Sequence, residues 1–227
     1  MPTGVEVVGS SGNFQITESY KNHSFHQRID FAAGAARVSF TTSAVRPIIA
    51  FRGDRTCIVA CSISGANRTY TLQRFNGGAL SVYVFGETPN VQASNTGVQV
   101  FNASGQLVFD SGYKYMRIFG SVQLPGPIPI STNVGVTVPR YLDVANGGKT
   151  LAVFTPYQRG GRFGVSEESG GGFGGSLYLL ADCVGIQGAK VEQGAMVVRQ
   201  EQGATDEYGY NEVNTPPVVF LVDVTGY

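Results

Sequence analysis

The sequence predicts an all-β protein built from two tandem related sandwich-like or barrel-like units, each opening with a similar β-hairpin. Three observations lead to this prediction. Apolar and polar residues alternate along many short runs, clusters of glycine, asparagine and proline separate these runs, and one stretch of nineteen residues occurs twice. Almost no segment shows the 3.6-residue periodicity of an amphipathic helix.

The repeated stretch reads TGVEVVGSSGNFQITESYK at residues 3–21 and TGVQVFNASGQLVFDSGYK at residues 96–114. Aligned without gaps, the copies share eight residues, which are Thr, Gly, Val, Val, Ser, Gly, Tyr and Lys. Several other positions are conservative, such as Phe14 against Leu107. Three explanations are open for the repeat: a catalytic function, a binding site or a repeated structural unit.

The local pattern of the second copy is typical of a β-hairpin. The run around Val100 alternates with a period of two, and a second such run follows it. Between the runs, Asn102 can bond to its own backbone, and Gly105 can adopt the positive φ that closes a short loop. We therefore expect a hairpin at 96–114 and an equivalent one at 3–21, which makes the repeat architectural.

Further strands are predicted along the rest of the chain. Ten runs have the length and composition of strands: 37–43, 47–53, 57–65, 69–75, 80–86, 134–140, 150–157, 176–184, 195–202 and 217–224. The segment 31–38 contains alanines but also a central glycine, and we interpret it as a connection. After each hairpin come an apolar strand, variable loops and an aromatic closing strand, so the repeat extends beyond the hairpin.

The domain organisation follows the repeat. The polar, proline-containing segment 87–95 is the expected boundary, which gives an N-terminal β domain at 1–92 and a C-terminal β domain at 93–227. The second copy is longer, and we expect its surplus in two long loops, the glycine-rich 158–175 and the acidic, tyrosine-containing 200–214. The sequence leaves open whether the two units share one core.

The charge content excludes several classes of protein. Charged residues make up 14% of the 227 residues and the formal net charge is zero, so no basic surface is expected for nucleic acid. Such a weakly charged surface suits a subunit that neighbours cover, including further copies of itself. No apolar run is long enough for a membrane-spanning helix, and the opening MPTGVEVVGS does not resemble a signal peptide, so we expect neither membrane insertion nor secretion.

The cysteines give no sign of disulfide or metal chemistry. Cys57, Cys61 and Cys183 are embedded in apolar runs, and we expect buried free thiols at all three. Their odd number argues against a disulfide framework, and their spacing matches no metal site. These features are compatible with folding in a reducing cytoplasm.

No pattern indicates catalysis. His23 and His26 are the only histidines, and no cysteine or patterned carboxylate accompanies them, so we interpret them as surface residues rather than as a metal pair. A glycosidase would need carboxylates that converge, and those in polar loops are Asp143, Glu167, Glu168, Asp206, Glu207 and Glu212. We therefore expect no enzyme activity, no cofactor and no metal.

Aromatic residues in or beside the two long loops are the candidate interaction residues. They are Tyr157, Phe163, Phe173, Tyr208 and Tyr210. Exposed aromatic side chains are enriched at protein interfaces, and they can also stack on sugars. We favour packing or a subunit contact over a glycan site.

The segment GVQVFNASGQLVFDSGYKYMRIFGS resembles a region of small structural proteins from the tail tip or baseplate of long-tailed, siphovirus-type bacteriophages. The shared pattern is a hairpin with an Asn or Asp turn and an Asp-Ser end, followed by a Met-Arg-Ile strand at 116–118. The runs SLYLLADCV and VVFLVDVTGY also resemble the C-terminal part of that family. The first copy departs from the pattern, because Thr17 and Glu18 replace Asp110 and Ser111.

The resemblance implies a structural component of a phage tail tip or baseplate that decorates the tail hub or anchors fibres. It implies hub, fibre or tail-tip subunits as partners, with synthesis in the bacterial cytoplasm and a final location in the virion tail. One alternative is a host-receptor module that binds a bacterial glycan or pilus through 158–175 and 200–214. Another is an enzyme that degrades surface polysaccharide. The motif names no active site.

Overall fold

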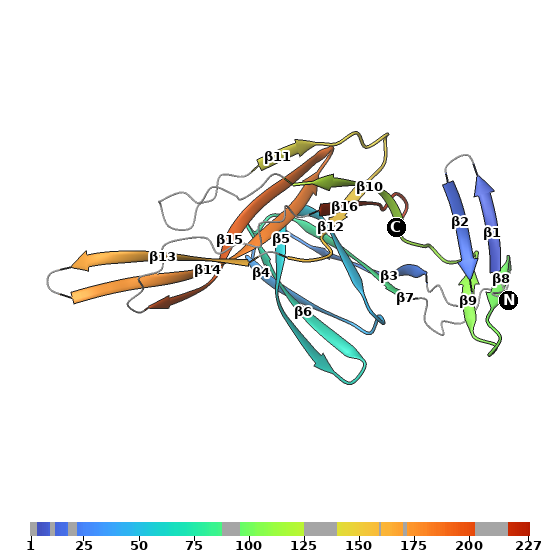
Figure 1. The fold of residues 1–227 in the computed structure, drawn as a ribbon, viewed down its shortest axis with the longest axis horizontal. Helices are drawn as coiled ribbons and strands as arrows, with labels where there is room; N and C mark the ends of the chain where they lie inside the picture. Colours follow the sequence, from blue (N-terminus) through green and yellow to red (C-terminus); the bar gives the residue numbers. More distant parts are fainter. Residues whose placement is uncertain are drawn as a thin grey trace.

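The structure is a computed structural model that describes residues 4–9, 12–17, 22–87, 96–124, 140–158, 160–169, 172–202 and 218–227. Every regular element in these residues is a β-strand, which confirms the predicted all-β class. Twelve strands form one large sheet that curls into a half-barrel, and two separate hairpins lie beside it (Figure 1). No helix of the described residues is long and apolar enough to cross a membrane.

The strands have the following bounds: β1 (Gly4–Gly9), β2 (Gly12–Thr17), β3 (His23–Phe31), β4 (Arg37–Thr42), β5 (Ile48–Ser64), β6 (Asn67–Arg74), β7 (Leu80–Glu87), β8 (Gln99–Phe101), β9 (Leu107–Asp110), β10 (Arg117–Gln123), β11 (Arg140–Asp143), β12 (Leu151–Phe154), β13 (Gly160–Ser169), β14 (Gly172–Gln187), β15 (Lys190–Gln202) and β16 (Val218–Asp223). The large sheet follows the path β10–β16–β12–β5–β14–β15–β11. β7 and β6 also pair with β5, β3 pairs with β7, β4 with β6, and β13 with β14.

The same pairing pattern occurs in both halves of the chain. After each hairpin, an edge strand (β3 or β10) pairs with a closing strand (β7 or β16), which pairs with an apolar strand (β5 or β12). A second group links β4, β6 and β5 in the first half and β11, β15 and β14 in the second. A bulge even recurs at equivalent positions, between Phe25 and Gln27 in β3 and between Ile118 and Gly120 in β10.

The two halves nevertheless share one sheet. β5 of the first half pairs with β12 of the second at Phe51 and Val153, and it also pairs with β14. On the opposite side, the segment after the second hairpin meets β3 through the bridge between Ser24 and Tyr115. Two separate sandwich or barrel units are therefore not confirmed, and the expected boundary at 92–93 lies outside the described residues.

Apolar side chains cover both faces of the central strands. One face carries a large core to which both halves contribute, with Phe51, Val82, Val84, Val153, Ile186 and Val191 among its buried members. The opposite face carries a smaller cluster that includes Ala50, Tyr83, Phe85, Ala152 and Val222. Strands that are buried on both faces appear in the sequence as continuous apolar runs, as the central strands do here.

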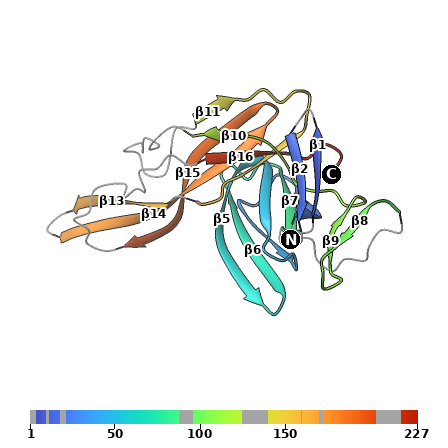
Figure 2. The same ribbon diagram turned by 45° about the vertical axis from the view of Figure 1, so that its right-hand side comes forward.

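The repeated stretches form the two hairpins that the sequence predicts. β1 pairs with β2, β8 pairs with β9, and β2 contacts β9, so the hairpins lie next to each other beside the sheet (Figures 1 and 2). In the second hairpin, the Asn102 Oδ1 atom accepts bonds from the backbone of Ser104 at 3.0 Å and of Gln106 at 2.8 Å. Gly105 has a φ of 74°, as the turn pattern requires.

The prediction of a long loop at 158–175 is wrong. Residues 158–175 are not a long loop, because β13 and the start of β14 form an antiparallel hairpin there that projects from the sheet (Figure 1). Alternation is hard to read in glycine-rich sequence, since glycine has no side chain to mark a face. The segment 200–214 begins inside β15, and its remaining residues lie outside the described part of the chain.

Candidate interaction surfaces

The structure describes the side chain of one predicted interaction residue. Tyr157 is 41% exposed and lines a cavity of about 200 Å³ beside β5 and β14. The cavity is mostly apolar, with the polar side chains of Gln158 and Asp182 among its lining residues. The Gln158 Oε1 atom accepts a hydrogen bond from the backbone of Ile58 at 3.1 Å, which ties this segment to β5.

The other four predicted interaction residues are placed less completely. Phe163 lies on β13 opposite Tyr178, and Phe173 lies on β14 opposite Glu168, so one hairpin carries both residues. Their side chains lie outside the described part of the structure, as do Tyr208 and Tyr210 altogether. The interaction role of the five aromatic residues therefore stays a prediction.

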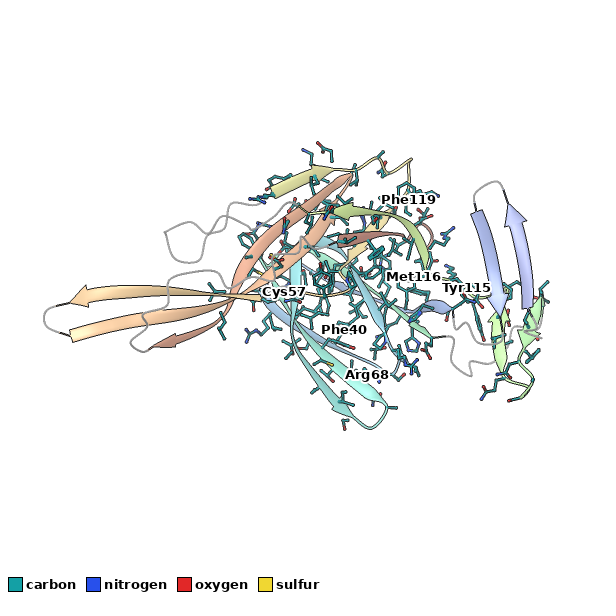
Figure 3. All side chains as sticks on the ribbon, in the orientation of Figure 1. Phe40, Cys57, Arg68, Tyr115, Met116 and Phe119 are labelled. Atoms are coloured by element: carbon teal, nitrogen blue, oxygen red, sulfur yellow. The ribbon has the colours of Figure 1, made fainter. Side chains whose placement is uncertain are left out.

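A second aromatic group was not predicted as a site from the sequence. Phe109 lies on β9 of the second hairpin, Tyr113 and Tyr115 follow it, and Tyr227 joins them from the far end of the chain. Together with Lys114, Arg117, Thr225 and Gly226, these residues line an open groove of about 490 Å³, which we call the aromatic groove. Figure 3 shows Tyr115 between the sheet and the hairpins.

Specific contacts hold the rings of the aromatic groove in place. The Tyr227 hydroxyl donates to the backbone carbonyl of Tyr115, and the Tyr227 ring meets Phe25 and Phe85 edge to face, with centroid distances of 5.2 and 5.8 Å. The Tyr115 hydroxyl accepts a bond from the backbone of Asp110 at 2.8 Å. The groove is therefore largely preformed, as binding sites for small molecules usually are.

The aromatic groove has a positive character. Lys114 and Arg117 lie over the Tyr227 ring at 5.5 and 5.7 Å from its centroid, and the described residues that line the groove include no acidic side chain. The pKa of the Tyr113 hydroxyl is raised by burial and by the nearby Asp110 charge. Burial also raises the pKa of the Tyr227 hydroxyl, although Arg117 opposes the effect. Both phenols therefore remain neutral at physiological pH.

Asp223 anchors the cationic side of the groove from beneath. Its buried carboxylate lies 3.1 Å from the Lys149 Nζ atom and 3.6 Å from the Arg117 Nη2 atom, and it accepts a bond from the backbone of Thr225 at 3.0 Å. Burial opposes ionisation of this carboxylate. The bonds from Thr225 and Lys149 and the charge of Arg117 outweigh that effect, so the pKa of Asp223 lies below its ordinary value.

We expect Asp223→Asn to lower the free energy of unfolding by about 1–2 kcal/mol at pH 7, because it removes charge-assisted hydrogen bonds. A lowered folded-state pKa stabilises the protein above the unfolded-state pKa, and this contribution is lost as pH falls through the lowered value. Urea unfolding of both proteins at pH 7 and at pH 3 measures the effect. A difference between the two proteins that is as large at pH 3 as at pH 7 would contradict it.

The prediction of three buried thiols is wrong for Cys61, which is exposed, whereas Cys57 and Cys183 are buried. The reason is that β5 leaves the core near its end, where its last five residues are exposed. Burial raises the pKa of Cys57 to about 12 and also raises the pKa of Cys183.

We expect a thiol reagent such as a dithionitrobenzoate to modify one cysteine per native chain at pH 8, since only the thiolate reacts. After denaturation, all three cysteines should react. Replacing Cys61 by Ser should abolish the native reaction. Rapid modification of two or more thiols in the native protein would show that the β5–β14 packing is not as described.

The remaining polar candidates do not gather into a site within the described residues. The His23 Nε2 atom lies 3.1 Å from the carbonyl oxygen of Arg46, and no group of three or more metal-binding side chains occurs in the described part of the chain. Asp143 lies on β11 and Glu167 on β13, strands that do not pair with each other. The acidic residues at 206–212 lie outside the described residues, so the absence of enzyme activity stays a prediction.

Exposed apolar side chains concentrate on or beside strands that pair on one side. β10 pairs only with β16 among the described strands, and it exposes 53% of Ile118 and 38% of Phe119. Phe119 is marked in Figure 3 at the outer rim of the sheet. We call Ile118 and Phe119 the apolar edge. Others of this kind are Val98, Phe101 and Tyr141, beside or on β8 and β11.

Comparisons with known proteins identify no relative that could be compared at these surfaces. The chain matches no protein-family model, and neither a curated protein nor a solved structure is significantly similar to it.

Proposed function

We propose that this chain is a structural component of a bacteriophage tail tip or baseplate, where it decorates the tail hub or anchors fibres through protein contacts. The observation that carries this proposal is the apolar edge on β10. An edge strand presents unpaired backbone groups, and soluble monomers usually protect such strands with charges or cover them. Ile118 and Phe119 are instead exposed and uncharged, which favours a strand that a neighbouring subunit covers.

Two further features support an assembly role. The surface has few charges to keep a monomer in solution, since charged residues make up 14% of the chain. Several hairpins extend away from the main sheet, among them β13–β14 and β5–β6 (Figure 2). Hairpins with little core of their own gain stability from a partner surface. The resemblance of 97–121 to phage tail proteins supplies the kind of assembly.

The proposal is tested by capturing the tagged full-length chain from lysate of phage-infected cells and identifying the proteins that come with it by mass spectrometry. We expect hub, fibre or other tail-tip subunits in a fixed ratio to the bait. An irrelevant tagged β protein from the same lysate is the control. Recovery of the chain alone, or of host proteins only, would contradict a structural role in the tail.

A further inference from the structure

The aromatic groove contains residues that the repeated architecture does not require. Both halves build a hairpin followed by an edge strand with the same bulge. Where the second half has Tyr115 and Arg117, the aligned positions of the first half carry Asn22 and Ser24. The first half forms its edge strand without a ring or a cation there, so Tyr115 and Arg117 are particular to the second half, where they contact Asp110 and Asp223 and also line the groove.

The groove combines two kinds of contact that rarely occur together on a bare surface. Phe109 and Tyr115 stack with ring centroids 5.1 Å apart and an interplanar angle of 10°, and Tyr113 stands 6.4 Å from Tyr115. These half-buried rings offer apolar faces. Beside them, Lys114 and Arg117 are exposed, and no acidic side chain is among the lining residues that the structure describes.

We propose that the aromatic groove binds a carboxylated saccharide of the uronic or sialic acid type. The aliphatic C–H face of a sugar ring stacks on an aromatic side chain, and the carboxylate meets the guanidinium and ammonium groups. A volume of about 490 Å³ lies within the usual range for small-ligand sites.

The charges of the groove and of the chain favour a carboxylated saccharide over a neutral sugar or a nucleic acid strand. Lys114 donates to the backbone carbonyl of Gly226, and Arg117 lies 3.6 Å from Asp223. The Arg117 side chain is nevertheless 56% exposed, so a ligand carboxylate can reach it, whereas a neutral sugar would make no ion pair there. A nucleic acid strand would use rings and cations too, but its affinity depends on an extended basic surface. The chain has as many acidic as basic residues, and the two groove cations stand without such a surface. This inference does not depend on the proposed function.

The test is isothermal titration of the full-length protein with trigalacturonate and with trisialic acid, using maltotriose as the neutral counterpart. We expect at least one acidic trisaccharide to bind at least tenfold more tightly than maltotriose, with an affinity that falls as salt rises. An oligothymidylate of matched charge should bind more weakly than that saccharide. Failure of both acidic saccharides to bind at millimolar concentration would overturn the proposal, and so would tighter binding of the oligothymidylate.

Variants locate the site. Arg117→Ala, Lys114→Met and Tyr113→Ala should each weaken saccharide binding at least tenfold, because each removes one of the contacts described above. Lys190→Ala and Tyr141→Ala are matched controls, since they remove an exposed cation and an exposed ring on other strands. Thermal unfolding checks that every variant is folded. Unchanged affinity in folded Lys114→Met and Tyr113→Ala, or an equal loss in the two controls, would place the ligand elsewhere.

Discussion

Gly185→Val should lower the free energy of unfolding by at least about 3 kcal/mol, which corresponds to a fall of about 10 °C in the melting temperature for a chain of this size. A Cβ atom on Gly185 would lie 2.6 Å from the carbonyl oxygen of Gly53 and 2.9 Å from the backbone nitrogen of Arg55. Both atoms belong to the backbone of β5, so neither can move without displacing the central strand.

A second glycine also shows how closely β14 and β15 approach β5. A Cβ atom on Gly194 would lie 2.6 Å from the Arg55 Nη1 atom, and the Arg55 guanidinium itself rests over the Phe75 ring at 3.6 Å. Gly185 and Gly194, on neighbouring strands, therefore make room for the β5 backbone at 53–55 and for the Arg55 side chain. This packing joins the two halves of the chain, so its loss should reduce the cooperativity of unfolding as well as the stability.

The matched control for this prediction is Gly120→Val. Gly120 lies on the edge strand β10, and a Cβ atom there would meet nothing within 4 Å. We expect its free energy of unfolding to stay within about 0.5 kcal/mol of the natural protein. Thermal unfolding followed by circular dichroism compares the three proteins, and equal melting temperatures for both variants would show that β14 does not lie against β5 as described.

Phe119→Asp should reduce the amount of tail subunit that is captured with the chain at least tenfold, if the apolar edge is the contact surface. A central aromatic residue of an interface commonly contributes about 2 kcal/mol or more, and a buried unpaired carboxylate adds a further penalty. Because Phe119 is 38% exposed in the free chain, the substitution should leave the fold intact. Capture from infected-cell lysate, quantified against the bait, measures the effect.

Ile63→Asp is the control for Phe119→Asp. Among the described residues, Ile63 is the most exposed large apolar side chain, at 68%, but it lies near the end of β5 rather than on β10. We expect this variant to capture its partners as the natural chain does. If instead both variants lose their partners to the same degree, general surface hydrophobicity rather than the apolar edge governs the association.

The sequence predicts two strands where the structure has one, because the contacts that stabilise the joining residues come from far away in the chain. The runs 47–53 and 57–65 form one strand, β5, although the polar residues between them predict a break. The Asp54 carboxylate is buried there and accepts bonds from the backbone of Asn76 at 3.0 Å and of Gly78 at 2.8 Å. These hydrogen-bond donors lie more than twenty residues from Asp54 in the sequence, so no local pattern predicts the contacts.

The strand β3 was missed for a different reason. Only three of the nine residues of HSFHQRIDF are apolar, and the bulge between Phe25 and Gln27 places Phe25 and Ile29 in different core clusters. A bulge puts two residues opposite one, so a strict period of two fails across it. The hairpins were predicted because their turns are local, and Asn102 and Gly105 determine the loop within a few residues.

The interaction surfaces were less predictable than the strands. The aromatic groove joins Tyr113 and Tyr115 to Tyr227, which lies more than one hundred residues further along the chain. No spacing rule links such residues, whereas the loop aromatic residues attracted attention because they are close in sequence. Among those, the structure describes the surroundings of Tyr157 alone.

The most direct test of the structural role is the protein composition of purified tails. Particles from infected cells would be separated on a density gradient and analysed by quantitative mass spectrometry, with an antibody against this chain to locate it by electron microscopy. We predict that the chain is present in a fixed copy number per tail and that the antibody labels the tail tip or baseplate. Its absence from purified tails, with the protein found only in the soluble fraction of the lysate, would contradict the account.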